Sequence, residues 1–291
     1  MSYGYDQPRR GLGFRLWPIL MAILVAAVMM FRGCQEGPFG RKQIVALTPQ
    51  EETALGAQAF QQILRESDVI QQGPIVDVVQ HIGRRIAKAA QSPRVLALMR
   101  MEPQQFDWQF RVIRNPQANA FCLPGGKVVV YTGILPVCQN EAALACVMGH
   151  EIGHALAHHG AERMAHEKLA QIGQLAVAQS FGNMDPYQQR QIYAVLGAGS
   201  RYGVLLPFSR KHESEADHIG ILLMAEAGYD PRESIRFWQR MEKQSGGKVP
   251  EFSSTHPSHE TRAHDLQGWL SEAMLLYQEA DQQPSRPFIF K

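Results

Sequence analysis

The chain has 291 residues, 45% of them hydrophobic, and a formal net charge of +2 at pH 7. This is enough to bury a full core in one domain of about 240 residues or in two smaller ones. The near-neutral charge, with no basic stripe interleaved with aromatic residues, argues against nucleic acid as a partner. The four cysteines, Cys34, Cys122, Cys138 and Cys146, form no C-x-x-C pair, so they indicate neither a zinc ribbon nor a required disulfide framework.

The amino-terminal region is predicted to hold a membrane segment. Residues 1–13 are polar and contain glycine, so we expect them to be disordered, and residues 14–32 follow as an apolar stretch. A bilayer span needs about 20 apolar residues, so this stretch is predicted to be a transmembrane anchor, with a cleaved signal-like segment as the alternative. No clear small-residue cleavage site follows it, which favours the anchor.

Basic residues flank the apolar stretch and bear on its orientation: Arg9, Arg10 and Arg15 precede it, and Arg32, Arg41 and Lys42 follow it. The three that precede it are joined by the charged amino terminus, which favours a cytoplasmic amino terminus and an exported globular part. We therefore expect a cell-envelope protein, anchored in the inner membrane with its globular domain on the periplasmic side.

Two helices are predicted early in the globular part. Residues 48–51, Thr-Pro-Gln-Glu, form a capping box with proline at the first helical position, so a helix is expected from there to Arg65. Apolar residues at helical spacing predict a second helix over residues 75–90. We expect both helices to brace a catalytic core.

Two strands are predicted next. The alternation over residues 108–113 and the β-branched run over residues 127–132 indicate strands, with a Pro-Gly-Gly turn signal at residues 124–126. An exposed strand edge beside an active site can hold an extended peptide by main-chain hydrogen bonds. The alternative is a hairpin that only covers the following helix, and the sequence does not separate the two interpretations.

The run H-E-I-G-H over residues 150–154 places two imidazoles four residues apart with a carboxylate between them. Asn140 as N-cap, Glu141 in the first turn and good helix formers after them predict a helix here. Residues four apart share a helix face, so both histidines can bind one cation with Glu151 near a metal-bound water. In H-E-x-x-H zinc peptidases this Glu takes a proton from the attacking water.

This helix is almost uncharged and is therefore expected to be buried, continuing to about Lys168. Two histidines and a carboxylate in such a setting are costly unless a divalent cation pairs them. His158 lies on the same face as His150 and His154, but three stacked turns form a line that cannot close a tetrahedron, so we reject it as third ligand. The alternative is a chance match to a short motif that binds no metal.

A catalytic zinc usually has three protein ligands and one open position, so the motif lacks one ligand. Glu213 and Asp217 are four residues apart on a second predicted helix, with Ser209 as candidate N-cap and Gly228 after its end. The two carboxylates share a face, whereas Glu215 points about 200° away from Glu213. One of the pair can bind zinc while the other orients a ligand from behind. The alternative is a charged solvent face.

Three motifs in order resemble the HtpX and CAAX prenyl protease group of zinc metallopeptidases, of the gluzincin type. They are N-A-F-x-x-P-G-G over residues 119–126, N-E-x-x-L-A-x-V-x-G-H-E-I-G-H over residues 140–154, and P-F-S-R-x-x-E-x-E-A-D over residues 207–217. The nearest branch is that of single-domain exported members such as BepA and LoiP, and the resemblance covers roughly residues 45–280. Cys122 departs from the small apolar residue common in relatives, and no tetratricopeptide-like repeats follow.

The resemblance implies a role for each motif residue. It implies one zinc ion per chain, bound by His150, His154 and Glu213, with Glu151 as general base and Asp217 orienting a ligand.

Two further sets of residues take roles only from the resemblance. In a later H-P segment, His256 is implied to be a removable fourth ligand that closes the open position at rest, and Arg262 a stabiliser of the oxyanion. Asn119, Ala120 and Phe121 of the first motif are implied to contact substrate.

The expected fold is α+β and mostly helical: a zincin-like metallopeptidase core with a small sheet beside the H-E-x-x-H helix, plus an N-terminal membrane helix. The expected divisions are a disordered start over residues 1–13, a membrane segment over 14–32, a linker over 33–47, a peptidase domain over 48–281 and a tail over 282–291.

The expected function is zinc-dependent hydrolysis of peptide bonds in misfolded or misassembled envelope proteins. Two alternatives belong to other classes. One is a chaperone-like envelope assembly factor whose zinc site is self-inhibited. The other is a structural zinc protein, which is disfavoured because structural sites prefer closed, cysteine-rich coordination.

Overall fold

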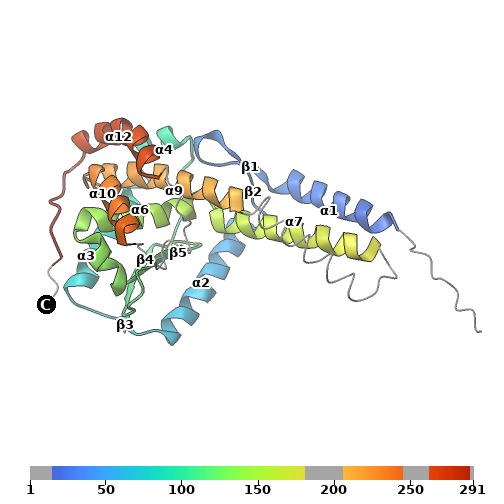
Figure 1. The fold of residues 1–291 in the computed structure, drawn as a ribbon, viewed down its shortest axis with the longest axis horizontal. Helices are drawn as coiled ribbons and strands as arrows, with labels where there is room; N and C mark the ends of the chain where they lie inside the picture. Colours follow the sequence, from blue (N-terminus) through green and yellow to red (C-terminus); the bar gives the residue numbers. More distant parts are fainter. Residues whose placement is uncertain (1–14, 181–205, 245–261, 289–291) are drawn as a thin grey trace, which may run out of the picture.

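The computed structural model describes residues 15–180, 206–244 and 262–288. They form a helical body from which α1 (Trp17–Gly33) and α7 (His159–Ser180) project side by side as an arm (Figure 1). The two helices are antiparallel, and the backbone N–H of Arg15 donates to the carbonyl of Ser180 at the tip. Within the described ranges, no helix combines the length and the apolar character that crossing a bilayer requires.

The segment expected to be a linker, residues 33–47, is built into the fold. Strands β1 (Cys34–Glu36) and β2 (Lys42–Ile44) pair antiparallel around the short helix η1 (Pro38–Gly40). Side-chain atoms of this hairpin reach the body, and Gln43 is buried. The hairpin therefore attaches the arm to the rest of the molecule.

The next helices begin where local sequence signals predict. Helix α2 (Pro49–Glu66) starts with the expected capping box, in which Thr48 and Glu51 satisfy each other's backbone groups. Helix α3 (Pro74–Ala89) matches the second prediction, and α4 (Pro93–Met99) follows it. Apolar residues of α2 and α3 are buried, so the two predicted helices are confirmed.

The sheet has four strands in the order β3-β4-β6-β5. They are β3 (Val69–Ile70), β4 (Gln109–Ile113), β5 (Ala120–Leu123) and β6 (Lys127–Tyr131). Strands β4 and β6 pair parallel, while β5 and β6 form a hairpin across a turn containing Gly125 (φ 78°) and Gly126 (φ 85°). The two predicted strands are confirmed as β4 and β6, but they are parallel, so the alternative in which they form a hairpin is wrong. The turn follows β5, a short strand that the alternation did not reveal.

Successive residues of these strands pack on opposite faces of the sheet. Phe60 of α2 packs with Ile113 and Val129 on one face. Val112 and Val130 face the main core on the other, where α3 and α6 (Glu141–Leu156) lie. The side chains alternate between the two faces, as expected for strands. Ala120 of β5 faces the main core, where β5 contacts α6.

Helix α6 begins as predicted, with the Asn140 side chain accepting a hydrogen bond from the N–H of Ala143 at 2.9 Å. It follows two short helices, η2 (Thr132–Ile134) and α5 (Leu135–Cys138). The expected continuation to Lys168 is wrong, because His158 adopts a left-handed φ of 53° and starts a separate helix, α7. The break turns the chain so that residue 159 can approach residue 154 again.

The remaining helices are α9 (Leu206–Glu226), α10 (Arg232–Gln244) and α12 (Arg262–Glu279). The expected N-cap at Ser209 is wrong, since α9 begins at Leu206 and residue 209 lies inside it. The predicted end is confirmed: Gly228 has a φ of 88°, and the N–H of Tyr229 bonds back to the carbonyl of Met224.

Helices α6 and α9 approach closely because small residues face each other. A Cβ on Gly149 would lie 2.9 Å from the carbonyl oxygen of Gly220, and one on Gly220 would lie 2.8 Å from the backbone nitrogen of His150. A Cβ on Gly153 would lie 3.0 Å from the carbonyl oxygen of Ala216. Main chain therefore nearly meets main chain, which brings the side chains of α9 to the histidines of α6.

Candidate active site

Three side chains converge where α6 and α9 meet. The Nε2 atoms of His150 and His154 are 3.1 Å apart. Glu213 places Oε2 at 3.3 Å from Nε2 of His150 and Oε1 at 3.5 Å from Nε2 of His154. Both His150 and Glu213 are buried, and His154 is partly exposed.

The spacing of these atoms fits a tetrahedral cation. Zinc bonds of about 2.0–2.2 Å at tetrahedral angles separate ligand atoms by about 3.3–3.6 Å. The three distances observed, 3.1, 3.3 and 3.5 Å, are close to that range. Two histidines and one carboxylate are also a ligand set of catalytic zinc sites, so the residues fit the metal.

The His150 side of the site is supported directly by charged groups. Nδ1 of His150 bonds to Oδ1 of Asp217 at 2.9 Å. Arg262 donates from Nε and Nη2 to the two oxygens of Asp217, each at 2.6 Å, and its guanidinium carbon lies 3.4 Å from the ring centre of Trp238. His150, Asp217 and Arg262 are all buried. The aspartate therefore fixes the ring so that Nε2 faces Glu213.

These charges set the electrostatics of the site. Burial lowers the pKa of His150, but its hydrogen bonds with Asp217 and Glu213 outweigh burial and raise the pKa to about 9. Burial raises the pKa of Asp217, but the charge of Arg262 and the bond to His150 hold it below its usual value. The site therefore attracts positive charge, and a divalent cation competes with the proton for Nε2.

The His154 side is supported through a second histidine. Nδ1 of His154 is 2.8 Å from Nδ1 of His159, and Nε2 of His159 is 2.7 Å from Oε2 of Glu215. Arg41 donates from Nε to both oxygens of Glu215 at 3.0 Å. Burial, with the charges of His154, His212 and Arg41, lowers the pKa of His159 well below its usual value, so its ring is neutral.

A second carboxylate shares the same guanidinium. Glu162 of α7 accepts from Nη1 of Arg41 at 2.9 Å and from Nη2 at 2.8 Å. His212 bonds to Glu162 at 3.0 Å, and its ring stacks on that of His159 with centroids 4.0 Å apart. Arg41 therefore holds two carboxylates behind His154, one of them buried.

Glu151 is buried at the same end of α6, 2% exposed. Burial raises the pKa of the Cys122 thiol, and the nearby charge of Glu151 raises it further, which places Cys122 of β5 close to this carboxylate. All four cysteines are free, and Cys138 and Cys146 are buried. The candidate general base therefore faces the strand that borders the metal site.

Of the three residues implied to contact substrate, Asn119 precedes β5, and Ala120 and Phe121 begin it; β5 is an edge strand of the described sheet. Ala120 is fully buried, and Phe121 packs edge-on against Tyr131 at 5.8 Å. The Asn119 side chain accepts a hydrogen bond from the N–H of Ala120 at 2.9 Å. Their side chains are engaged within the protein, so contact with a peptide has to use their backbone.

Of two further histidines in the sequence prediction, one lies apart from the site and the other falls outside the described residues. His158 bonds through Nδ1 to Oε2 of Glu52 in α2 at 3.0 Å, away from the three converging donors, as its rejection as a ligand requires. His256 lies outside the described residues. Arg262 is 3% exposed and committed to Asp217, so its position suits support of His150 better than contact with an oxyanion.

Sequence reasoning missed several residues of the site: Arg41, His159, Glu162, His212, Glu215 and Trp238. For most of them no local pattern exists, because Arg41 is 174 residues from Glu215 in the chain and 121 residues from Glu162. One signal was present. A charged residue that lies near a ligand in an otherwise apolar pair of helices costs folding free energy unless another charge pairs with it, so such partners could have been expected.

The sequence of this chain is similar to those of known peptidases. The model described as Peptidase family M48 matches residues 79–270. The chain is 40% identical to the mitochondrial metalloendopeptidase OMA1 of Schizosaccharomyces pombe over 65% of this chain and 53% of that protein. It is 32% identical to the protein of the same name of Saccharomyces cerevisiae, over 83% of this chain and 70% of that protein. It is 29% identical to the beta-barrel assembly-enhancing protease of Yersinia pestis, over 75% of this chain and 44% of that protein. The chain therefore spans about half the length of the first of these relatives.

The comparisons correct the expected location. An inner-membrane anchor with an exported, periplasmic domain in a bacterial cell envelope was inferred from flanking charge and from the exported branch of the family. The relatives with 40% and 32% identity are named as mitochondrial, whereas the beta-barrel assembly-enhancing protease is less similar. The envelope assignment is therefore wrong. The resemblance to zinc metallopeptidases is confirmed, because the family match extends over both helices that carry the site: the chain belongs to peptidase family M48.

Proposed function

We propose that this protein is a zinc-dependent metalloendopeptidase in which His150, His154 and Glu213 hold the metal and Glu151 is the general base. The observation that carries the proposal is the convergence of His150, His154 and Glu213, whose ligand atoms lie within 4.8 Å of one another, beside a buried carboxylate. The names of the relatives, which are metalloendopeptidases, support the same reaction class.

A zinc ion held by His150, His154 and Glu213 would supply a Lewis acid for the scissile carbonyl and would lower the pKa of a water molecule toward about 7. Glu151 accepts the proton of that water as its oxygen attacks the carbonyl carbon, and then donates it to the leaving amine. Asp217 and His159 hold the two imidazoles with Nε2 toward the metal. Arg262 fixes Asp217 from behind, so its proposed part is positioning.

The substrate is proposed to bind as an extended strand along β5. This strand pairs on one side with β6, lies at an edge of the described sheet, and packs against α6. Backbone groups of residues 119–121 are the proposed contacts, since main-chain pairing holds peptides of varied sequence. Misassembled proteins are the proposed substrates; the name of one relative, the beta-barrel assembly-enhancing protease, links a similar protease to protein assembly.

The test of the general base is Glu151→Gln. The variant should retain one zinc per chain by metal analysis and lose at least about 100-fold of the rate of peptide hydrolysis, because the amide cannot accept the proton. Glu213→Ala is the matched variant for the metal, and should lose zinc. Cleavage by Glu151→Gln at the wild-type rate, or full zinc content in Glu213→Ala, would contradict the assignment.

We also propose that α1 attaches the protein to a membrane. Its support is a row of large apolar side chains that remain exposed on the arm: Trp17, Leu20, Met21, Ile23, Leu24 and Phe31. The full chain should float with phosphatidylcholine vesicles, and a Leu20→Glu, Leu24→Glu variant should not, while its zinc content stays normal. Equal flotation of the two proteins would refute this role.

A further inference from the structure

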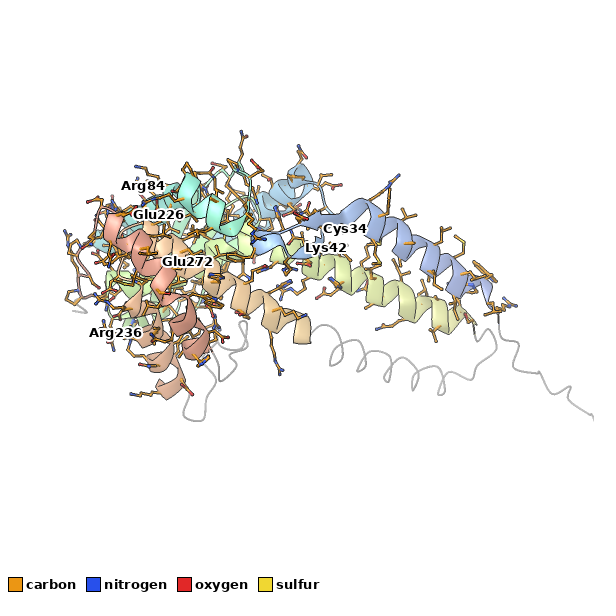
Figure 2. The ribbon with its side chains drawn as sticks, turned by 90° about the horizontal axis from the view of Figure 1, so that it is seen from above. Cys34, Lys42, Arg84, Glu226, Arg236 and Glu272 are labelled. Atoms are coloured by element: carbon orange, nitrogen blue, oxygen red, sulfur yellow. The ribbon has the colours of Figure 1, made fainter. Side chains whose placement is uncertain are left out.

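The support behind His154 differs from that behind His150 because it includes a residue from outside the helices of the site. His154 contacts His159, His159 contacts Glu215, and Glu215 accepts two hydrogen bonds from Arg41. Arg41 belongs to the hairpin at the root of the arm, between η1 and β2. Figure 2 labels two residues of this hairpin, Cys34 and Lys42, which lie where the arm meets the body.

One arrangement of protons satisfies the whole series of contacts. A histidine that binds a metal through Nε2 carries its proton on Nδ1, so His154 donates to Nδ1 of His159. His159, which accepts at Nδ1, then carries its own proton on Nε2 and donates it to Glu215. The carboxylate at the end of the series determines which nitrogen of His154 faces the metal.

The carboxylate in turn depends on Arg41. Glu162 is buried, the side chain of Glu215 is 8% exposed, and the two share this one guanidinium, which uses Nε for Glu215 and Nη1 and Nη2 for Glu162. Two carboxylates that share a countercharge repel each other when it is removed. Glu215 would then move from the position in which it accepts from His159.

We propose that Arg41 is a positioning residue for the metal site, acting through Glu215 and His159 on His154. The inference rests on the proposed function, since it takes His154 as a metal ligand. It makes the arm and its hairpin part of the metal site, because the residue that completes the support of one ligand is connected through β1 to α1.

The experiment is Arg41→Gln in the full chain. Zinc affinity is measured by competition with a chromophoric chelator, and the visible absorption spectrum of the Co2+-substituted protein reports the geometry at the metal. We expect about 10-fold weaker zinc binding, at the low end of the range for residues that orient ligands, and a changed Co2+ spectrum. The matched control is Arg240→Gln, because Arg240 is similarly part-buried and holds a buried carboxylate, Glu233, which contacts Asn140 at the start of α6. It should leave both measurements unchanged.

Two more variants identify the route. Arg41→Lys keeps the charge and should bind zinc with intermediate affinity. This variant tests the proposal if Arg41→Gln folds poorly. In a Glu215→Gln background, Arg41→Gln should cause no further loss, because the series is already broken.

Two results would overturn the proposal. One is wild-type zinc affinity and Co2+ spectrum in both Arg41 variants, even with lowered thermal stability, which would reduce Arg41 to a structural contact. The other is full additivity with Glu215→Gln. Failure of the proposed function looks different, because the wild-type chain would then bind no zinc.

Discussion

The two histidines of the site lie on one helix and face one point, yet the protein supports them in different ways. Behind His150 a single aspartate is clamped by Arg262, and all three side chains are buried. Behind His154 the support passes through a neutral imidazole to a carboxylate, and ends on an arginine that is 25% exposed. The first arrangement joins neighbouring helices, whereas the second reaches a hairpin far away in the chain.

The difference indicates which side of the site contributes more to folding stability and which can change metal binding alone. A fully buried ion pair is costly to break because each partner is left without solvent or countercharge. In the second arrangement only the guanidinium of Arg41 reaches water, at 25% exposure, so water can replace it beside the carboxylates and its loss costs less. We therefore expect the His150 side to dominate folding stability, and the His154 side to change metal binding with a smaller effect on folding.

The largest expected effect is that of Asp217→Ala, which breaks the buried side. Arg262 would be left buried without its partner, so we expect a loss of about 3–5 kcal/mol of unfolding free energy, together with about 10- to 100-fold weaker zinc binding. Urea denaturation of the metal-free protein measures the first quantity. Arg41→Gln, compared under the same conditions, should lose clearly less. Equal losses in the two variants would show that the two sides do not differ.

Metal removal should give the next largest effect. Free zinc at 100 times its dissociation constant stabilises the folded state by about 2.7 kcal/mol, so a chelator should lower the melting temperature of the wild-type chain. A tenfold weaker site loses about 1.4 kcal/mol of this gain at the same free zinc. The zinc-dependent rise in melting temperature should therefore be smaller in Arg41→Gln and absent in Glu213→Ala. An unchanged rise in Glu213→Ala would mean that zinc stabilises the protein at another place.

The smallest expected effect is a change in how folding stability depends on pH, caused by His218, which lies outside the metal site. His218 of α9 stacks between Phe39 and Trp269, with ring centroids 4.2 and 4.4 Å away. Burial lowers the pKa of His218, although Glu272 raises it in part. Because the unfolded chain then binds the proton more readily, the contribution of His218 is fully present above pH 6.5 and is lost as the pH falls below it.

His218→Phe should therefore flatten the fall in stability between pH 6.5 and pH 5, by at most about 1.4 kcal/mol per pH unit. Thermal melts of the chelator-treated protein across this range measure the effect without interference from zinc. The control is His264→Phe, at a histidine whose side chain is 91% exposed, which should keep the wild-type slope. If the two variants have the same slope, His218 is not the group responsible.

Local chemistry made much of the metal centre predictable. The spacing of His150 and His154, and of Glu213 and Asp217, follows from the period of one helix each, so the four residues could be assigned to two faces. That the faces meet depends on glycines, whose role in helix packing has no periodic signature. Gly220 looked like a weakness in its helix, yet it is the point of close approach to α6.

The residues that escaped prediction are those placed by long-range structure. His159 reaches His154 only because the chain turns at His158, a left-handed residue that no sequence signal marked. Arg41 was counted as a flanking charge, since nothing near it in the sequence shows its carboxylate partners. The strand β5 was missed because its four residues are too few to show alternation beside a stronger turn signal.

The contact between Gly149 and Gly220 has a consequence for which ions the protein accepts. Where two backbones touch, no change of rotamer can move the helices closer or further apart, so the span between the imidazoles and the acidic side chain is nearly invariant. An ion such as Ca2+, with bonds of about 2.3–2.6 Å and a need for six to eight oxygens, would require a wider and more oxygen-rich space. Discrimination by ionic radius is in this way a property of the main chain, imposed by residues that never touch the ion.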